Sequence, residues 1–137
     1  MLADTMGIPI KPRATENGEL ILLVDDEEGF FKMVGLCLTK AGYKVLRAAN
    51  GREALMQMRE TEGVDLVFTD INMPVMDGGT LIRELNQTHS TAKIIVTTGV
   101  GGAAFEEELK TMGVRHFLRK PFTPAILLLA VRQAPDD

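Results

Sequence analysis

The chain has few of the residues on which disulfide frameworks, metal cages and membrane spans depend. Its 137 residues include one cysteine, two histidines and no tryptophan. The lone Cys37 cannot form an internal disulfide, and its place in a helical apolar pattern favours a buried structural thiol. No stretch approaches the ~20 apolar residues of a membrane span, and the first residues do not resemble a secretory leader. We therefore expect a cytoplasmic protein that makes no contact with a membrane.

The chain also has no excess of basic residues. It carries 15 Lys and Arg against 19 Asp and Glu, which gives a net charge of −4, and the two signs are interspersed. Proteins that bind a nucleic-acid backbone neutralise its phosphates with clustered Lys and Arg. Direct binding to nucleic acid is therefore not favoured.

The length and the hydrophobic content of 45% fit one domain. Residues 1–18 contain Pro9, Pro12 and no sustained hydrophobic period, so we expect a flexible lead or linker there. The domain is predicted at residues 19–134, followed by a disordered tail at residues 135–137.

Short apolar runs alternate with amphipathic segments along the predicted domain. Five runs have the length of strands, and each precedes a segment with helical spacing: LILLV, YKVLRA, VDLVF, KIIV and RHFLRK. Asn50 with Glu53, and Thr123 with Pro124, are typical of helix starts. The alternation predicts an α/β fold with a parallel sheet, because parallel neighbours need crossover helices, and these cover both faces of the sheet.

The predicted strands differ in how much charge they carry. LILLV, LVF and IIV are continuous apolar runs, typical of central strands, whereas YKVLRA and RHFLRK interleave charges and suit sheet edges. The second and fifth strands are therefore expected outermost. This predicts a flavodoxin-like (βα)5 fold of strand order 2-1-3-4-5, in which a ligand crevice opens beyond the carboxyl ends of the first and third strands.

Polar side chains stand at the ends of four predicted strands. Asp25 and Asp26 follow the first strand, Asp70 ends the third, Thr98 ends the fourth, and Lys120 ends the fifth. Crowded carboxylates raise one another's pKa unless a cation neutralises them. The ligands nearby in the sequence are oxygens, which favours Mg²⁺ over zinc. The sequence therefore predicts a magnesium site at the three aspartates.

Asp70 lies in the stretch VFTDINMPVMDG, where an apolar strand runs into a carboxylate. The backbone carbonyl of Asn72, two residues on, can supply a further metal ligand. The ammonium of Lys120 and the hydroxyl of Thr98, together with the metal, can surround a phosphoryl group. We interpret Asp70 as a nucleophile that forms an aspartyl phosphate, with Lys120 and Thr98 as its catalytic partners.

These motifs together resemble the receiver domain of two-component response regulators. The resemblance covers about residues 19–133 and rests on LLVDDE, FTDINMPVMDG, IIVTTG and FLRKPF. It implies a phosphoryl group taken from a sensor histidine kinase or a phosphotransfer protein, dependence on Mg²⁺, and slow self-hydrolysis. The chain is then expected to be a signalling switch that catalyses its own phosphorylation and dephosphorylation, and not an enzyme acting on a separate substrate.

The resemblance also implies which residues switch. Thr98 is expected to move toward the phosphoryl group, and Phe117 to turn inward. The face formed by the fourth helix, the fifth strand and the fifth helix is expected to bind a downstream protein or a second copy of the chain. A cis bond between Lys120 and Pro121 is expected as well.

Other interpretations of the same residues stay open. A small phosphohydrolase with an aspartate nucleophile needs a second acid two residues after it, where this chain has Asn72. A degenerate receiver that serves only as a protein-binding module would lack one of the acids or the lysine, and this chain keeps them. A flavin-binding domain of the same topology needs a phosphate-cradling loop after the first strand, and this sequence has no such loop there. The chain is either a stand-alone regulator or a piece of a hybrid kinase, in which residues 1–18 are a linker.

Two helical segments carry further predictions. FEEELK is interpreted as a solvated helix face with Glu106 and Lys110 in i,i+4 relation. AILLLAV is apolar for seven residues, more than one core-facing stripe needs, so we expect an outward apolar patch for homodimerisation or docking. Leu127 and Leu128 are the positions chosen to test that patch, and coverage by residues 1–18 is the alternative.

Overall fold

The computed structural model describes residues 19–71, 78–87, 92–99 and 103–133 of the chain. Strands and helices alternate along these residues: β1 Leu20–Val24, α1 Glu28–Lys40, β2 Lys44–Ala48, α2 Gly51–Glu60, β3 Val64–Asp70, α3 Gly78–Gln87, β4 Lys93–Thr98, α4 Ala103–Lys110, β5 His116–Arg119 and α5 Pro124–Gln133. The predicted alternation is therefore confirmed. None of the described helices combines the length and the apolar character of a transmembrane span.

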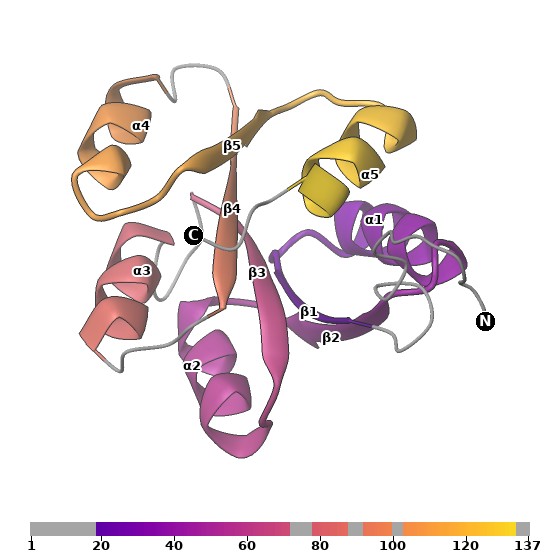
Figure 1. Ribbon diagram of the computed structural model, residues 1–137, viewed down its shortest axis with the longest axis horizontal. Helices are drawn as coiled ribbons and strands as arrows, with labels where there is room; N and C mark the ends of the chain where they lie inside the picture. Colours follow the sequence, from indigo (N-terminus) through magenta and orange to yellow (C-terminus); the bar gives the residue numbers. More distant parts are fainter. Residues whose placement is uncertain (1–18, 72–77, 88–91, 100–102, 134–137) are drawn as a thin grey trace, which may run out of the picture.

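The described strands form a parallel sheet of order β2-β1-β3-β4-β5, as predicted. The uncharged runs occupy its centre, where β1 is almost wholly buried, and the strands with interleaved charges lie at its two edges. Figure 1 shows α1 and α5 on one side of the sheet and α2, α3 and α4 on the other. Every crossover therefore covers part of a face that would otherwise expose apolar side chains to water.

Apolar side chains fill the space on both faces of the sheet. Beneath α1 and α5, Phe68 of β3 packs with Leu38 and Leu127. On the other face, one cluster joins Leu22 of β1 to Leu81 of α3, and a second lies beneath α3 and α4. A fully buried leucine or phenylalanine contributes about 1.5–3 kcal/mol of transfer free energy, so these clusters fix the strand ends in place.

Local signals in the sequence set the ends of several helices. The backbone N–H of Glu53 donates to Asn50 Oδ1 at 2.9 Å, and the Glu53 carboxylate accepts from the backbone N–H of Ala49 at 2.9 Å. This reciprocal cap confirms the predicted start of α2. Gly42 and Gly113 have φ values of 101° and 94°. A left-handed residue of this kind ends α1 and turns the chain into β2, and likewise follows α4 before β5.

Helix α5 exposes different residues from those chosen on the sequence. Leu127 is 1% exposed, and Leu128 packs partly buried against the same cluster, so the choice of these two positions was wrong. The exposed large side chains of this helix are Ile126 and Leu129, at 48% and 54%. Leu127 and Val131 are four residues apart and share the inward stripe, which places Ile126 on its flank and Leu129 on the side away from the core.

Candidate functional site

The strand order brings together residues that are far apart in the sequence. Val24 of β1 pairs with Thr69 of β3, so the residues that follow, Asp25 and Asp70, lie side by side at the carboxyl edge. Lys120 follows β5 at the same edge, and its Nζ lies 3.3 Å from Asp70 Oδ2. We call Asp25, Asp26, Asp70 and Lys120 the acid pocket.

The acid pocket holds more negative than positive charge. One carboxylate oxygen from each of its three aspartates lies within 4.8 Å of the other two. The Lys120 ammonium lies 3.8 Å from Asp25 Oδ2 and 3.3 Å from Asp70 Oδ2. One ammonium cannot neutralise three carboxylates, so the pocket attracts a further cation.

Asp25 is the buried member of the acid pocket. Its Oδ1 accepts a hydrogen bond from the backbone N–H of Glu27 at 2.8 Å. Its Oδ2 is buried and, within the described part of the chain, has no hydrogen-bond partner. Burial raises the pKa of Asp25, and so do the neighbouring Asp70 and Asp26 carboxylates, whereas the Glu27 N–H and the Lys120 ammonium lower it. A cation beside Oδ2 would stabilise the charged form.

The donor set of the acid pocket fits a hard divalent cation. It offers carboxylate oxygens, one of them buried without a hydrogen-bond partner among the described residues. Mg²⁺ prefers such oxygens and keeps several waters, which suits a pocket whose third acid, Asp26, is exposed. Asn72, predicted to add a backbone carbonyl, lies outside the described residues.

Neighbouring elements hold Lys120 close to the aspartates. The bond from Lys120 to Pro121 is cis, as the family resemblance implied. The backbone N–H of Lys120 donates to the carbonyl of Thr98 at 2.8 Å. Its ammonium also lies 4.3 Å from the centre of the Phe30 ring of α1. A cation over an aromatic face is attracted to it, so α1 helps to hold the charge over the pocket.

Thr98 lies at the same edge of the sheet, but its hydroxyl has another partner. The side chain is buried, and Oγ1 donates to Glu106 Oε2 at 3.3 Å. Arg119 donates to both oxygens of the same carboxylate, at 3.1 Å and 3.2 Å. We call Thr98, Glu106 and Arg119 the Glu106 bridge. The structure thus brings the three aspartates and Lys120 together, while the Thr98 hydroxyl contacts Glu106 of α4.

The prediction of a solvated face for FEEELK was wrong at one position. Glu106 is 7% exposed and pairs with Arg119, whereas Lys110 pairs with Glu107 at 3.1 Å. The sequence held a signal for this, because Glu106 stands three residues before the buried Leu109 and so shares its inward stripe. Glu107 and Glu108, on the other faces of α4, are exposed as predicted.

Phe117, predicted to switch, is partly buried in β5. It packs against the cluster that contains Val96 of β4 and Leu109 of α4. Its ring therefore lies beneath α4, on the side of the sheet that carries the Glu106 bridge. Whether it moves on phosphorylation stays a prediction.

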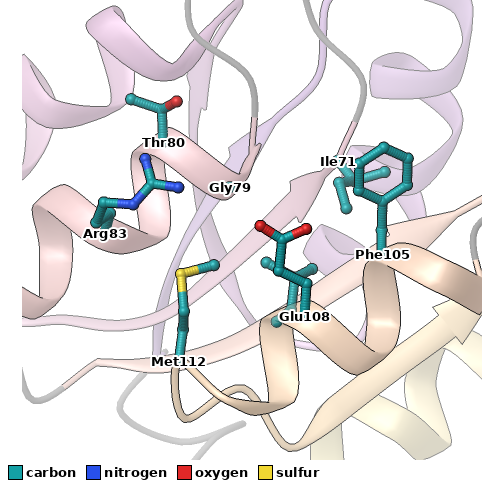
Figure 2. A pocket seen from close by; sticks show the side chains of 8 residues that line it. Ile71, Gly79, Thr80, Arg83, Phe105, Glu108 and Met112 are labelled. Carbon is teal, nitrogen blue, oxygen red and sulfur yellow. The ribbon is translucent and has the colours of Figure 1, made fainter.

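A second hollow lies between α3 and α4, lined by Ile71, Gly79, Thr80, Arg83, Phe105, Glu108, Leu109 and Met112, with a volume of about 150 Å³. Figure 2 shows the Arg83 guanidinium and the Glu108 carboxylate entering it from opposite helices, with the Phe105 ring at one end. The hollow shares no lining residue with the acid pocket, although Ile71 directly follows Asp70.

Comparison with known proteins relates this arrangement to one family. Residues 21–132 match the family model of the response regulator receiver domain. The chemotaxis protein CheY of Thermotoga maritima is 38% identical over 117 residues, which are 85% of this chain and 97% of that protein. The sensor kinase CckA of Brucella abortus is 43% identical over 115 residues, which are 82% of this chain and 12% of that protein.

The solved structures agree with this relationship. The Vibrio cholerae chemotaxis protein CheY4 has a TM-score of 0.80 and 32% identity, with 86% of this chain and 99% of that chain covered. A response regulator receiver domain protein from Clostridium thermocellum has a TM-score of 0.80 and 30% identity, with 85% of this chain and 93% of that chain covered. The chain thus spans nearly all of some relatives and a small part of others, such as the sensor kinase.

Proposed function

The chain belongs to the response regulator receiver domain family, and from this membership we propose that Asp70 is the residue that accepts the phosphoryl group. As a receiver domain it is a phosphoacceptor of two-component signalling. The observation that carries the assignment to Asp70 is the position of its carboxylate, beside the other two aspartates and 3.3 Å from the Lys120 ammonium. Its side chain is 14% exposed, which leaves it accessible to a phosphoryl donor.

The proposed chemistry is transfer of a phosphoryl group between two nucleophiles. A carboxylate oxygen of Asp70 attacks phosphorus, and the bond from phosphorus to the donor, such as a phosphohistidine nitrogen, breaks with its electron pair leaving on the donor. Lys120 moves its ammonium from the Asp70 carboxylate to an oxygen of the incoming phosphoryl group, where negative charge gathers. Asp25, Asp26 and Asp70 would hold Mg²⁺, which when bound offsets the charge of the carboxylates and of the phosphoryl oxygens.

The proposed partner upstream is a sensor histidine kinase or a phosphotransfer protein. Thr98 and Phe117 form the proposed switch, and the output surface is the face of α4, β5 and α5. This surface carries Ile126 and Leu129 of α5, which are 48% and 54% exposed. Exposed apolar side chains on one helix suit a downstream protein or a second copy of the chain.

The chain acts as a switch that is itself modified, and not on a separate substrate, and it resides in the cytoplasm, where phosphoryl donors of this kind are made. Residues 19–134 form the receiver domain, with residues 1–18 as a lead or linker and residues 135–137 as a tail.

Phosphoryl uptake tests the proposal directly. The chain is incubated with acetyl phosphate and Mg²⁺, and its intact mass is measured. We expect the gain of one phosphoryl group, and no gain in Asp70→Asn. Asp65→Asn is the matched control, because it removes a carboxylate from the other end of the same strand and keeps an acceptor for the backbone N–H of Leu20. If the native chain gains no mass with any donor, the proposal fails and the chain is interpreted as a protein-binding module.

A further inference from the structure

The register of the last two strands explains why the Glu106 bridge forms. Thr98 of β4 pairs with Arg119 of β5, so the two side chains lie next to each other on one face of the sheet. Alternate residues share a face, and Val96 and Phe117, two positions earlier, pack beneath α4. Helix α4 packs so that Glu106 contacts both Thr98 and Arg119. Its carboxylate accepts from the Thr98 hydroxyl at 3.3 Å and from the Arg119 guanidinium at 3.1 Å and 3.2 Å.

Arg119 fixes the carboxylate that holds Thr98. A guanidinium that donates to both oxygens of a carboxylate sets its orientation as well as its charge. The Glu106 side chain is 9% exposed, so its negative charge needs this partner, whereas the Arg119 side chain is 71% exposed and remains hydrated. The bridge is neutral, so it buries no unpaired charge of its own.

The Thr98 hydroxyl carries one proton and can donate to one acceptor at a time. While it donates to Glu106, it cannot donate to a phosphoryl oxygen on Asp70. Asp70 pairs with Thr97, the residue directly before Thr98, so the two acceptors lie on opposite sides of the end of β4. Phosphorylation places three strong acceptor oxygens on the Asp70 side, and these compete with Glu106 for the same proton.

We propose that Glu106 is a positioning residue of the switch, which holds the Thr98 hydroxyl on the α4 side until a phosphoryl group on Asp70 displaces it. This inference rests on the proposed phosphorylation of Asp70. The hydrogen bond of the phosphoryl group to the Thr98 hydroxyl must be stronger than the one between Thr98 and Glu106 that it replaces. When Thr98 leaves, α4 loses one of the contacts that tie it to the end of β4, and Glu106 keeps Arg119 on β5. The bridge thereby couples the acid pocket to the position of α4.

Weakening the bridge should favour the phosphorylated-like state. Beryllium fluoride with Mg²⁺ serves as the phosphoryl mimic, and its affinity is measured by titration of backbone amide resonances. Glu106→Gln leaves Thr98 a neutral acceptor, and hydrogen bonds to charged acceptors are roughly twice as strong as neutral ones. We expect beryllium fluoride to bind Glu106→Gln about fivefold more tightly than the native chain. Glu107→Gln removes the same charge from an exposed position on α4 and should match the native chain.

The double variant decides whether Glu106 acts through Thr98. In a Thr98→Val background the hydroxyl is gone, so Glu106→Gln should leave the affinity for beryllium fluoride unchanged. The proposal would be overturned if Glu106→Gln raised the affinity for beryllium fluoride equally with and without the Thr98 hydroxyl. It would also be overturned if Glu106→Gln alone had the native affinity. A double-variant cycle of this kind isolates the coupling between two side chains.

A measurement on the native chain covers the case in which Glu106→Gln does not fold. Three-bond couplings report the χ1 rotamer of Thr98 before and after addition of beryllium fluoride. We expect one rotamer in the free chain and a change to another with the mimic bound. An unchanged rotamer in a chain that binds the mimic overturns the role of Glu106, while failure of the native chain to gain a phosphoryl group counts against Asp70 itself.

Discussion

The acid pocket and the Glu106 bridge lie at the same edge of the sheet, yet their charges are balanced in different ways. The pocket sets three carboxylates against one ammonium, and the bridge sets one carboxylate against one guanidinium. The pocket therefore keeps a net negative charge that attracts a cation, whereas the bridge is neutral and orients its partners. Clusters made of similar groups can thus have different roles: the acid pocket is suited to binding a cation, and the Glu106 bridge to positioning the Thr98 hydroxyl.

The pKa values of the buried carboxyls in the acid pocket and in the Glu106 bridge are shifted in opposite directions. Burial and neighbouring carboxylates raise the pKa of Asp25, so the ionised pocket is costly for the fold without a cation. Arg119 and the Thr98 hydroxyl lower the pKa of Glu106 against the opposing effect of burial, so the ionised bridge is stable as it stands. Substitutions on the two sides should therefore act in opposite directions on stability.

The largest effect is expected for Lys120. In Lys120→Met the ammonium no longer reaches the charge that gathers on the transferred phosphoryl group, and loss of such a group slows a reaction by about 100-fold or more. The rate of mass gain with acetyl phosphate measures this. Lys110→Met is the control, because Lys110 is exposed and pairs with Glu107. An unchanged rate in Lys120→Met would remove Lys120 from the acid pocket's chemistry.

The second largest effect is expected for the affinity for Mg²⁺. Asp26→Asn removes one of the three charges that surround the proposed ion, and we expect Mg²⁺ to bind at least about tenfold more weakly. Isothermal titration measures the affinity. Glu27→Gln removes a neighbouring exposed charge from a side chain that makes no helix-capping hydrogen bond, and should bind Mg²⁺ like the native chain. Equal losses in both variants would point to general attraction and not to a site.

A smaller effect is expected when the buried acid of the pocket, Asp25, is replaced and the stability of the fold is measured. Asp25→Asn removes the buried charge and keeps an acceptor for the Glu27 N–H, so without divalent cation we expect the free energy of unfolding to rise by roughly 1 kcal/mol, or ~4 °C in Tm. Added Mg²⁺ should raise the Tm of the native chain and not that of the variant. Thermal unfolding with EDTA and with Mg²⁺ measures both. A variant less stable than the native chain in EDTA would contradict this account.

The smallest effect is expected for the bridge and depends on pH. Because the pKa of Glu106 lies below its ordinary value of 4.5, its ionised form stabilises the fold above that value, and this contribution is lost as pH falls through the lowered pKa. At pH 7 we expect Glu106→Gln to melt about 2 °C or less below the native chain. Thermal melts from pH 7 to pH 3 should show the difference shrink below pH 4.5. A constant difference would show that the charge of Glu106 does not contribute.

Much of the fold could be predicted because its signals are local. Uncharged runs marked the central strands, charged runs marked the edges, and Asn50 with Glu53 marked the start of α2. The acids at the ends of β1 and β3 could also be placed together, since the strand order alone makes those ends neighbours. These inferences need the period of a strand or a helix, and no knowledge of how a helix is turned about its axis.

The errors arose where that rotation mattered. On α5 a run of apolar residues could not tell Leu127, which faces the core, from Leu129, which faces water. On α4 three successive acids looked equally solvated, although Glu106 shares the inward stripe of Leu109. Packing against the sheet chooses the rotation of each helix, and that choice involves residues from several elements at once.

The amino-acid sequence by itself determined the order of the strands and the chemical groups at their carboxyl ends, because hydrophobic period and charge placement act over a few residues. The tertiary structure alone decided which acceptor the Thr98 hydroxyl meets. Glu106 is eight residues from Thr98 and 13 from Arg119, and no local rule joins such positions. They meet because the register of β4 with β5 sets two of the side chains together, and the packing of α4 brings the third.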